Sequence, residues 1–486
     1  MSSPSRVILW SGALVLVLIL LALLGAASRL RGGLHQYEAD LRAQGEKLSF
    51  AELTSGRKPN GVDSHAIVTN IAAKLSGARL SPGSLELRRF IQPGKARVTW
   101  ERPELTWSQS AGTSSNGTWE DLDAQMNAAQ STLQETRQAL KEPAADAGPC
   151  TNMLASRRVN FVAIRTVAQW LMGATENELH HGRLEGALQD LEALAGLANM
   201  ERDEPTLVAQ MVRVAVAGLG LTVTWEALQA PGWTDPQLDR LQKAWAPVDL
   251  VAALEKGFAG ERACGCECFA QIRRSSGPQT GRMFSTLWGT SSSKAVFENL
   301  MLGYVYMPAY KLAWINEDQL FYLKTMQESL AAPRLLRAHR PWLEATQSVA
   351  KVGARLNNLN GWSDKFRYFF SLMAIPNFTR ASERAAQVET ERQMTLAAIG
   401  LKRYQLRHGE LPPNLEALAP EFLPVLPYDP MSGKSLCYHL KGDGGFVLYS
   451  VGEDGEDDGG DSNPRAGGRF DLWQGRDAVW PVRVEE

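Results

Sequence analysis

The residues best suited to chemistry lie in one acidic stretch near the end of the sequence, LYSVGEDGEDDGGD, from Leu448 to Asp461. Six of its residues are acidic and four are glycines. Carboxylate and backbone carbonyl oxygens are the ligands that Ca²⁺ prefers, and glycines let carbonyl groups turn inward. The stretch therefore predicts a calcium-binding loop, and the alternative is a solvated acidic turn that holds no metal.

The spacing of these acids is not that of an EF-hand, because the ordered Asp positions and the terminal Glu are absent. Three cysteines, Cys264, Cys266 and Cys268, form a second candidate site, since clustered thiolates bind soft metals. Zinc sites usually space their cysteines by two to four residues and add a second pair elsewhere. On a helix, only Cys264 and Cys268 share a face. We therefore interpret all three as small buried residues.

Motifs of enzymes are missing from the sequence. The GKS at 433–435 is not a P-loop, because Tyr428 stands where the first glycine is required. No Gly-x-Ser-x-Gly elbow occurs, and the pair His180 and His181 has no metal-ligand spacing around it. The motifs favour a protein that binds rather than one that catalyses.

Composition excludes several other classes of protein. A chain of 486 residues is long enough for two or three domains. The net charge of −2 gives no basic field for nucleic acid, so we expect no nucleic-acid partner. The five cysteines are an odd number without a closely spaced framework, which argues against a disulfide-stapled fold.

The N-terminal region predicts a membrane anchor. From Val7 to Ala27 the chain runs 21 residues without a charge, which is long enough to span a bilayer as a helix. A signal peptide ending at 25–27 is the alternative, but the apolar run exceeds the usual signal-peptide core. We expect a single-pass, uncleaved anchor in a bacterial inner membrane, in contact with lipid. The bulk of the chain is then periplasmic, although arginines flank both ends of the run and leave the orientation open.

No later stretch matches this run in length. The nearest rival, Val214 to Trp225, is twelve residues long and indicates a buried core helix.

Four segments follow from the composition along the chain. They are the anchor (1–31), a membrane-proximal region rich in helix and loop (32–150), an α-helical domain (151–380) and a small α+β domain (381–486).

Within these segments, residues 80–121 are polar and predict a loop with one short strand, and residues 119–140 predict one helix. Apolar residues recur at helical spacing through 151–380, which predicts packed helices without a sheet. This domain weakly resembles tetratricopeptide repeats, but no 34-residue period recurs.

The last segment combines one helix with a hairpin. Helical spacing continues from 381 to 408, where Gly409 ends it. Two strands, Leu436 to Leu440 and Phe446 to Val451, are joined by KGDGG as a hairpin turn.

This order of elements resembles the globular part of the major pseudopilin of type II secretion systems. The matching pieces, in order, are AAIGLKRYQLRHGELPPNLEAL, LPYDPMSGKSLCY, YSVGEDGEDDGG and RDAVW, within about residues 385–481. Met431 replaces an aromatic residue of that family's pattern. The overall layout also resembles uncharacterised membrane-anchored proteins of planctomycete-type bacteria.

The resemblance to pseudopilins implies a calcium site in the acidic loop. Asp454 matches the family's first side-chain ligand, and Asp477 falls where the family has a closing Asp. Asp457, Asp458 and Asp461 are further candidate ligands. The chain departs from the family at its start, because SSPSRVILWSG has no prepilin-peptidase site. We therefore do not expect it to polymerise as a pilin subunit.

Together these features predict a mainly α protein with three parts: a transmembrane helix, a large helical body and a small pseudopilin-like domain. We expect a membrane-anchored extracytoplasmic binding or scaffold protein whose protein partners belong to a secretion or pilus-like system. The alternative is a membrane-anchored hydrolase with its site in the helical body. A pocket with convergent acid, base or nucleophile groups would favour the enzyme.

Overall fold

A computed structural model of the chain describes residues 28–56, 64–75, 88–108, 114–141, 160–281, 301–375, 378–465 and 467–484. The protein is 64% helical and 7% strand, which confirms the mainly α fold class. The apolar run at 7–27 lies outside the described residues, so the membrane-spanning helix stays a prediction.

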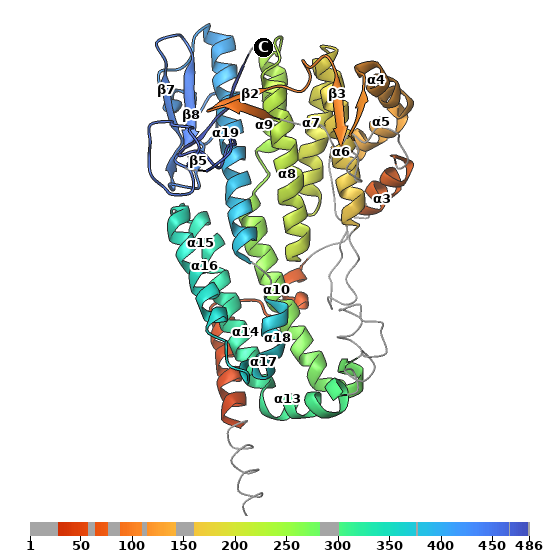
Figure 1. The fold of residues 1–486 in the computed structure, drawn as a ribbon, viewed down its shortest axis with the longest axis vertical. Coiled ribbons are helices and arrows are strands. Elements are labelled where there is room, and N and C mark those ends of the chain that lie inside the picture. The colour runs from red at the N-terminus through yellow and green to blue at the C-terminus, as the bar shows by residue number, and fades with distance from the viewer. Residues whose placement is uncertain are drawn as a thin grey trace, which may run out of the picture.

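Six helices form the centre of the molecule, and α8 lies among α6, α7, α10 and α19 (Figure 1). Among the described residues, α8 is the one helix long and apolar enough to cross a membrane, yet 67% of its most apolar stretch is buried inside the protein. This confirms a buried core helix, longer than the apolar run alone indicated. The six helices are α6 (Phe161–His180), α7 (Leu184–Met200), α8 (Leu207–Leu228), α9 (Asp235–Trp245), α10 (Leu250–Arg274) and α19 (Phe378–His408).

A glycine sets the close packing at the middle of this bundle. A Cβ on Gly220 of α8 would lie 2.7 Å from the ring of Trp245, which is fully buried at the end of α9. Only a residue without a side chain lets the indole lie against the helix at this distance.

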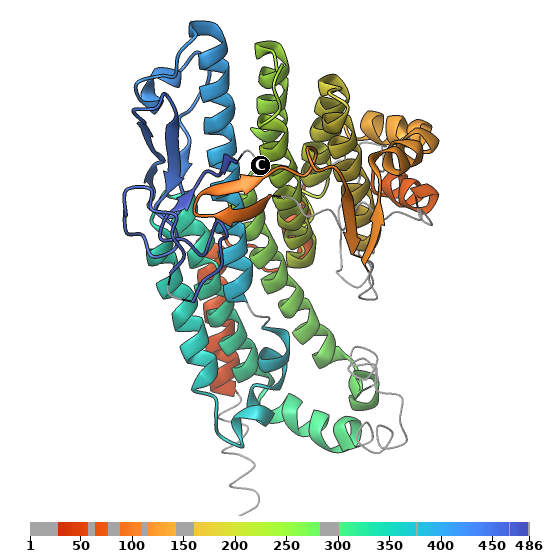
Figure 2. The same cartoon turned by 45° about the horizontal axis from the view of Figure 1, so that its top comes forward.

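In the lower part of the molecule, α10 continues below the other central helices and is surrounded by further helices (Figures 1 and 2). Over 160–281, 301–375 and 378–380, every regular element is helical, so the prediction of packed helices without a sheet is confirmed for these residues. The elements here are a helix at 28–43, α2 (Phe50–Thr54), η3 (Leu302–Tyr306), α13 (Met307–Ala313), α14 (Ile315–Ser329), α15 (Ala331–Arg337), α16 (Trp342–Asn357), α17 (Asp364–Arg367) and α18 (Phe369–Ala374).

Three shorter helices, α3 (Ser64–Leu75), α4 (Trp119–Ala128) and α5 (Gln130–Ala139), flank α6 and α7. A capping box between Thr118 and Asp121 begins α4. The prediction of one helix over 119–140 is wrong, because Ala129 has φ −93° and ψ 3° and separates α4 from α5.

The prediction of a loop with one strand at 80–121 is also wrong. Four strands lie there: β1 (Arg89–Gln92), β2 (Lys95–Arg97), β3 (Leu105–Ser108) and β4 (Ser114–Gly117). The sheet of β1 and β2 is completed by β10 (Val482–Arg483), which pairs parallel to β2. Strands this short carry little alternation, and the partner strand stands at the opposite end of the chain.

The C-terminal segment follows the predicted order. Gly409, with φ +78°, ends α19, and the predicted hairpin is present as β7 (Cys437–Leu440) paired antiparallel with β8 (Phe446–Ser450). The remaining elements are η4 (Leu415–Leu418), β5 (Tyr428–Asp429), β6 (Lys434–Ser435) and β9 (Ala478–Val479). Residues of α19 and α8 belong to one hydrophobic core. The segment boundaries at 31, 150 and 380 stay predictions.

A buried ion network fixes the helix at 28–43 to the body. Glu46, just beyond that helix, accepts hydrogen bonds from Arg262 Nη2 at 2.7 Å and Arg334 Nη1 at 2.6 Å. Gln327 Nε2 adds a third at 2.9 Å. Burial alone would raise the pKa of Glu46, but these three hydrogen bonds lower it to about 2. The side chain of Arg262 is 1% exposed, so Glu46 supplies the negative charge that this buried cation needs.

We expect Glu46→Ala to lower the free energy of unfolding by about 3–5 kcal/mol, because it leaves the Arg262 guanidinium buried without a counter-charge. Denaturant melts of the detergent-solubilised chain measure this change. The control is Glu344→Ala, which removes an exposed i, i+4 pair with Arg340 and should cost less than about 1 kcal/mol. Equal losses in the two variants would contradict the role of Glu46.

Candidate functional site

All five predicted calcium ligands lie on or beside the loop that leads from β8 to β9. Asp477 is buried and acts as the organising group of this loop. Its carboxylate accepts backbone N–H groups from Gly460 at 2.7 Å, Asp461 at 3.1 Å and Asp458 at 3.4 Å. Burial raises the pKa of Asp477, and the three amides oppose that rise. The loop therefore turns N–H groups inward, one of them from Gly460, where the sequence predicted carbonyl oxygens.

The other acidic side chains of the loop have separate partners. Asp454 pairs with Arg465 at 2.7 Å, and Asp461 pairs with Arg476 at 3.3 Å. Asp457 accepts the hydroxyl of Tyr449 at 2.9 Å. The carboxylate of Asp458 is exposed.

Among the described residues, no three His, Cys, Asp or Glu side chains converge as metal ligands. The donor set in this conformation therefore does not fit a calcium ion, and calcium stays a prediction of the resemblance.

The cysteines of α10 are divided between two environments. Cys264 and Cys268 share a face and hydrogen-bond to each other, which raises the pKa of Cys264. Cys266 packs instead against leucines of the N-terminal helix, and burial raises its pKa to about 12. All three are half-buried and carry free thiols. Their arrangement supports a role in packing.

Two buried glutamates form a constellation that the sequence did not indicate. Glu176 of α6 and Glu226 of α8 are both fully buried. Glu226 accepts hydrogen bonds from the backbone N–H of Thr99 at 2.5 Å, the Thr99 hydroxyl at 3.0 Å and the N–H of Arg88 at 2.8 Å. Neither oxygen of Glu176 has a partner among the described residues. The segment around β1 and β2 is thus fixed onto α8 by one carboxylate, next to a second that is unsatisfied.

The environment of this pair suppresses ionisation. Burial, with the hydrogen bonds to Arg88 and Thr99 opposing it, raises the pKa of Glu226 to about 7. Burial and the neighbouring Glu226 raise the pKa of Glu176 well above its usual value, and Arg102 only partly opposes this. Burial and the neighbouring carboxyl group thus favour the neutral form of Glu176.

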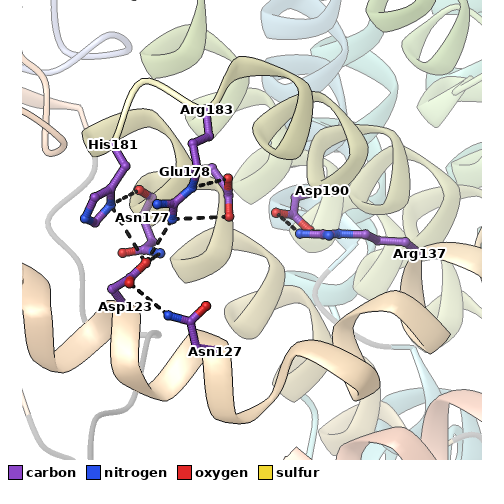
Figure 3. A network of polar contacts seen from close by, with 8 residues as sticks. All are labelled: Asp123, Asn127, Arg137, Asn177, Glu178, His181, Arg183 and Asp190. Atoms are coloured by element: carbon purple, nitrogen blue, oxygen red, sulfur yellow. Dashed lines mark hydrogen bonds and ion pairs between the residues drawn. The ribbon is translucent and has the colours of Figure 1, made fainter.

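A separate set of polar contacts joins α4 to the end of α6 and the turn that follows it (Figure 3). Asp123 accepts hydrogen bonds from Asn177 Nδ2 at 2.8 Å and Arg183 Nη2 at 2.9 Å. His181 Nδ1 donates to the carbonyl oxygen of Asn177 at 2.8 Å, in the tautomer that carries the proton on Nδ1. The neighbouring His180 stacks on Trp119 with ring centroids 4.1 Å apart.

A second contact in the same view ties α5 to α7. Arg137 Nε lies 2.7 Å from an oxygen of Asp190, whose pKa burial raises to about 6 despite the guanidinium. These contacts hold helices together. The buried pair Glu176 and Glu226 has no exposed surface, so a substrate cannot reach these carboxyl groups in this conformation.

Sequence reasoning missed the glutamate pair for an identifiable reason. Glu176 and Glu178 are two positions apart in ATENELH, and nothing in the local pattern separates them. The two residues differ in the side of the helix on which they lie. Glu178 pairs with Arg183 at the surface, whereas Glu176 points into the core.

Comparison of the chain with protein-family models, with curated proteins and with solved structures gives no significant match.

The loop geometry predicts that Asp477→Ala lowers the free energy of unfolding by about 1–3 kcal/mol, because three partly buried amides lose their acceptor. Asp458→Ala, which removes an exposed carboxylate from the same loop, is the control and should change stability little. Melting of both variants in EDTA measures the effect without metal.

The same melts test the predicted calcium site. Ligation would raise the wild-type midpoint with calcium more than with magnesium, and Asp454→Ala would remove the rise. A wild-type midpoint unmoved by millimolar calcium would leave the loop as a solvated turn held by Asp477.

The glutamate pair predicts a stability that falls as pH rises. An unfolded Glu ionises near pH 4.3, whereas burial raises the pKa of Glu226 to about 7 and also raises the pKa of Glu176, so the unfolded state releases protons first as the pH rises. We expect Glu176→Gln to gain stability relative to the wild type between pH 5 and pH 8. Midpoints of thermal unfolding at both pH values measure this, with the exposed Glu416→Gln as control. Parallel pH profiles for wild type and Glu176→Gln would refute the assignment.

Proposed function

We propose that the chain is a membrane-anchored extracytoplasmic binding or scaffold protein, held in the bilayer by residues 7–27, with its helical body standing on the membrane surface. The observation that carries this proposal is an exposed apolar surface at the end of the molecule where the described chain begins.

This base surface comes from two segments, 301–312 and 362–372. Trp362 is 82% exposed and Tyr304 65% exposed, which is unusual for large aromatic side chains. The segments touch, since the hydroxyl of Tyr306 donates to the carbonyl oxygen of Phe366 at 2.6 Å. The exposed residues of the base surface are Met301, Tyr304, Val305, Leu312, Trp362, Phe366 and Leu372.

The position of the base surface supports contact with lipid. In both views α13 and α17 lie toward the same end of the molecule as the start of the helix at 28–43 (Figures 1 and 2). The uncharged run at 7–27 directly precedes that helix in sequence. Aromatic side chains with nearby lysine and arginine are typical of surfaces that lie in the membrane interface. An anchor at this end would bring the base surface against the headgroups.

The proposed function also includes protein partners that contact the acidic loop. With the base on the membrane, the acidic loop stands at a distance from it, where a protein of a secretion or pilus-like system can reach it. The pseudopilin-like identity of the last segment and the tetratricopeptide-like layout of the body belong to this proposal. Their support is the order α19, β7, β8 and the α6–α7 hairpin. The anchored hydrolase has less support, because the best pair of acidic groups is buried.

Reconstitution with a photoactivatable phospholipid tests the proposed function. Cross-links identified by mass spectrometry should fall within 301–312 and 362–372. The control is the segment around Leu406 at the far end of α19, which is 49% exposed and should remain unlabelled.

Carbonate extraction of the same vesicles should leave the chain in the pellet. Release of a soluble species beginning near Ser28, or labelling of both ends alike, would overturn the proposed function.

A further inference from the structure

A cavity near the base carries an unbalanced positive charge. It has a volume of about 510 Å³, within the range of small-molecule sites, and lies along the helix at 28–43 between α10 and α14. Arg31, Arg42, Arg273 and Lys311 line it, together with Glu38, Glu267 and His35.

The acidic groups of the cavity are already engaged. Glu267 accepts the backbone N–H of Phe50 at 2.9 Å. Glu38 accepts Gln319 Nε2 at 2.8 Å and lies 3.5 Å from His35. The cavity's carboxylates are therefore committed to positioning the N-terminal segment.

Three cations that line the cavity form no ion pair with an acidic side chain among the described residues: Arg31, Arg273 and Lys311. Arg273 donates only to the side-chain oxygen of Asn316 at 3.0 Å, and Lys311 to the carbonyl oxygen of Ser275. Desolvation lowers the pKa of Lys311 and of Arg273, and Arg31 adds to the effect at Arg273, where Glu38 opposes it. The second residue of α14, Asn316, lines the same space.

A larger cavity of about 750 Å³ offers a comparison. Three of its cations are already paired: Arg202 with Asp203, Arg240 with Glu185 and Glu192, and Lys243 with Asp239. Of these two cavities, the one near the base is lined by several cations that lack counter-charges in the described part of the chain.

We propose that the cavity between the N-terminal helix, α10 and α14 binds a phosphate group through Arg31, Arg273 and Lys311. A phosphate group offers several acceptor oxygens and a negative charge that three cations lining one cavity can balance. Charge-assisted hydrogen bonds of this kind are strong. Two sources supply such a group, an anionic lipid headgroup and a free phosphate. The site goes beyond the proposed function, because it operates whether or not the base surface touches a bilayer.

The test uses the full chain in uncharged detergent, titrated calorimetrically with inorganic phosphate in a chloride buffer. Wild type should bind, and Lys311→Gln and Arg273→Gln should each bind about tenfold more weakly. Lys311→Arg keeps the charge and should retain binding. Lys351→Gln, which removes one exposed positive charge from α16, is the matched control and should bind as the wild type does.

The same titration in nanodiscs identifies the source of the phosphate. If nanodiscs containing phosphatidylglycerol block phosphate binding while phosphatidylcholine nanodiscs do not, the ligand is a lipid headgroup. If neither lipid competes, the ligand is free phosphate. The proposal is overturned if the wild type binds phosphate in neither medium, or if Lys351→Gln weakens binding as much as Lys311→Gln. Lipid cross-linking can fail while phosphate still binds in detergent, so the two proposals stand or fall separately.

Discussion

The lower half of this protein depends on one buried cation. Arg262 points from α10 into a region where its side chain is 1% exposed, and a lone guanidinium there would cost several kcal/mol. Glu46 compensates it from a segment distant in sequence and also binds Arg334 of α15. This contact fixes residues 44–48, which in turn set the helix at 28–43 alongside α10 and α14. One wall of the phosphate cavity and the direction of the predicted anchor both follow from that placement.

Elements with local signals could be predicted from the sequence. The end of α19 follows from Gly409 and the β7–β8 turn from KGDGG, because a positive φ and a tight turn are local requirements. The burial of α8 followed from the short uncharged run Val214 to Trp225 within it. The pairing of β2 could not be predicted, since its parallel partner β10 is far away in the sequence and the two strands meet only in the folded protein. The break between α4 and α5 at Ala129 could not be predicted either, because the sequence has helical spacing on both sides of it.

The candidate sites divide in the same way. The composition of the acidic loop identifies it as a candidate site. Composition does not say whether the loop backbone presents carbonyl oxygens to a cation or N–H groups to a carboxylate. Asp477 decides this in the described conformation by accepting three amides. The phosphate cavity has no sequence signature, because Arg31, Arg273 and Lys311 belong to three separate helices and only tertiary packing brings them together.

The pairing of β10 with β2 has a consequence for how the chain is made. Trp225 is fully buried on α8, and its indole N–H donates at 3.0 Å to the carbonyl oxygen of Pro481, one residue before β10. Because Pro481 follows Trp225 by 256 residues, a growing chain leaves this buried donor without its acceptor, and β2 without its second partner strand, until the segment around β10 has been added. Removal of residues 481–484 would leave both defects. The pairing of β10 with β2 therefore makes completion of the helical bundle depend on a segment far along the chain.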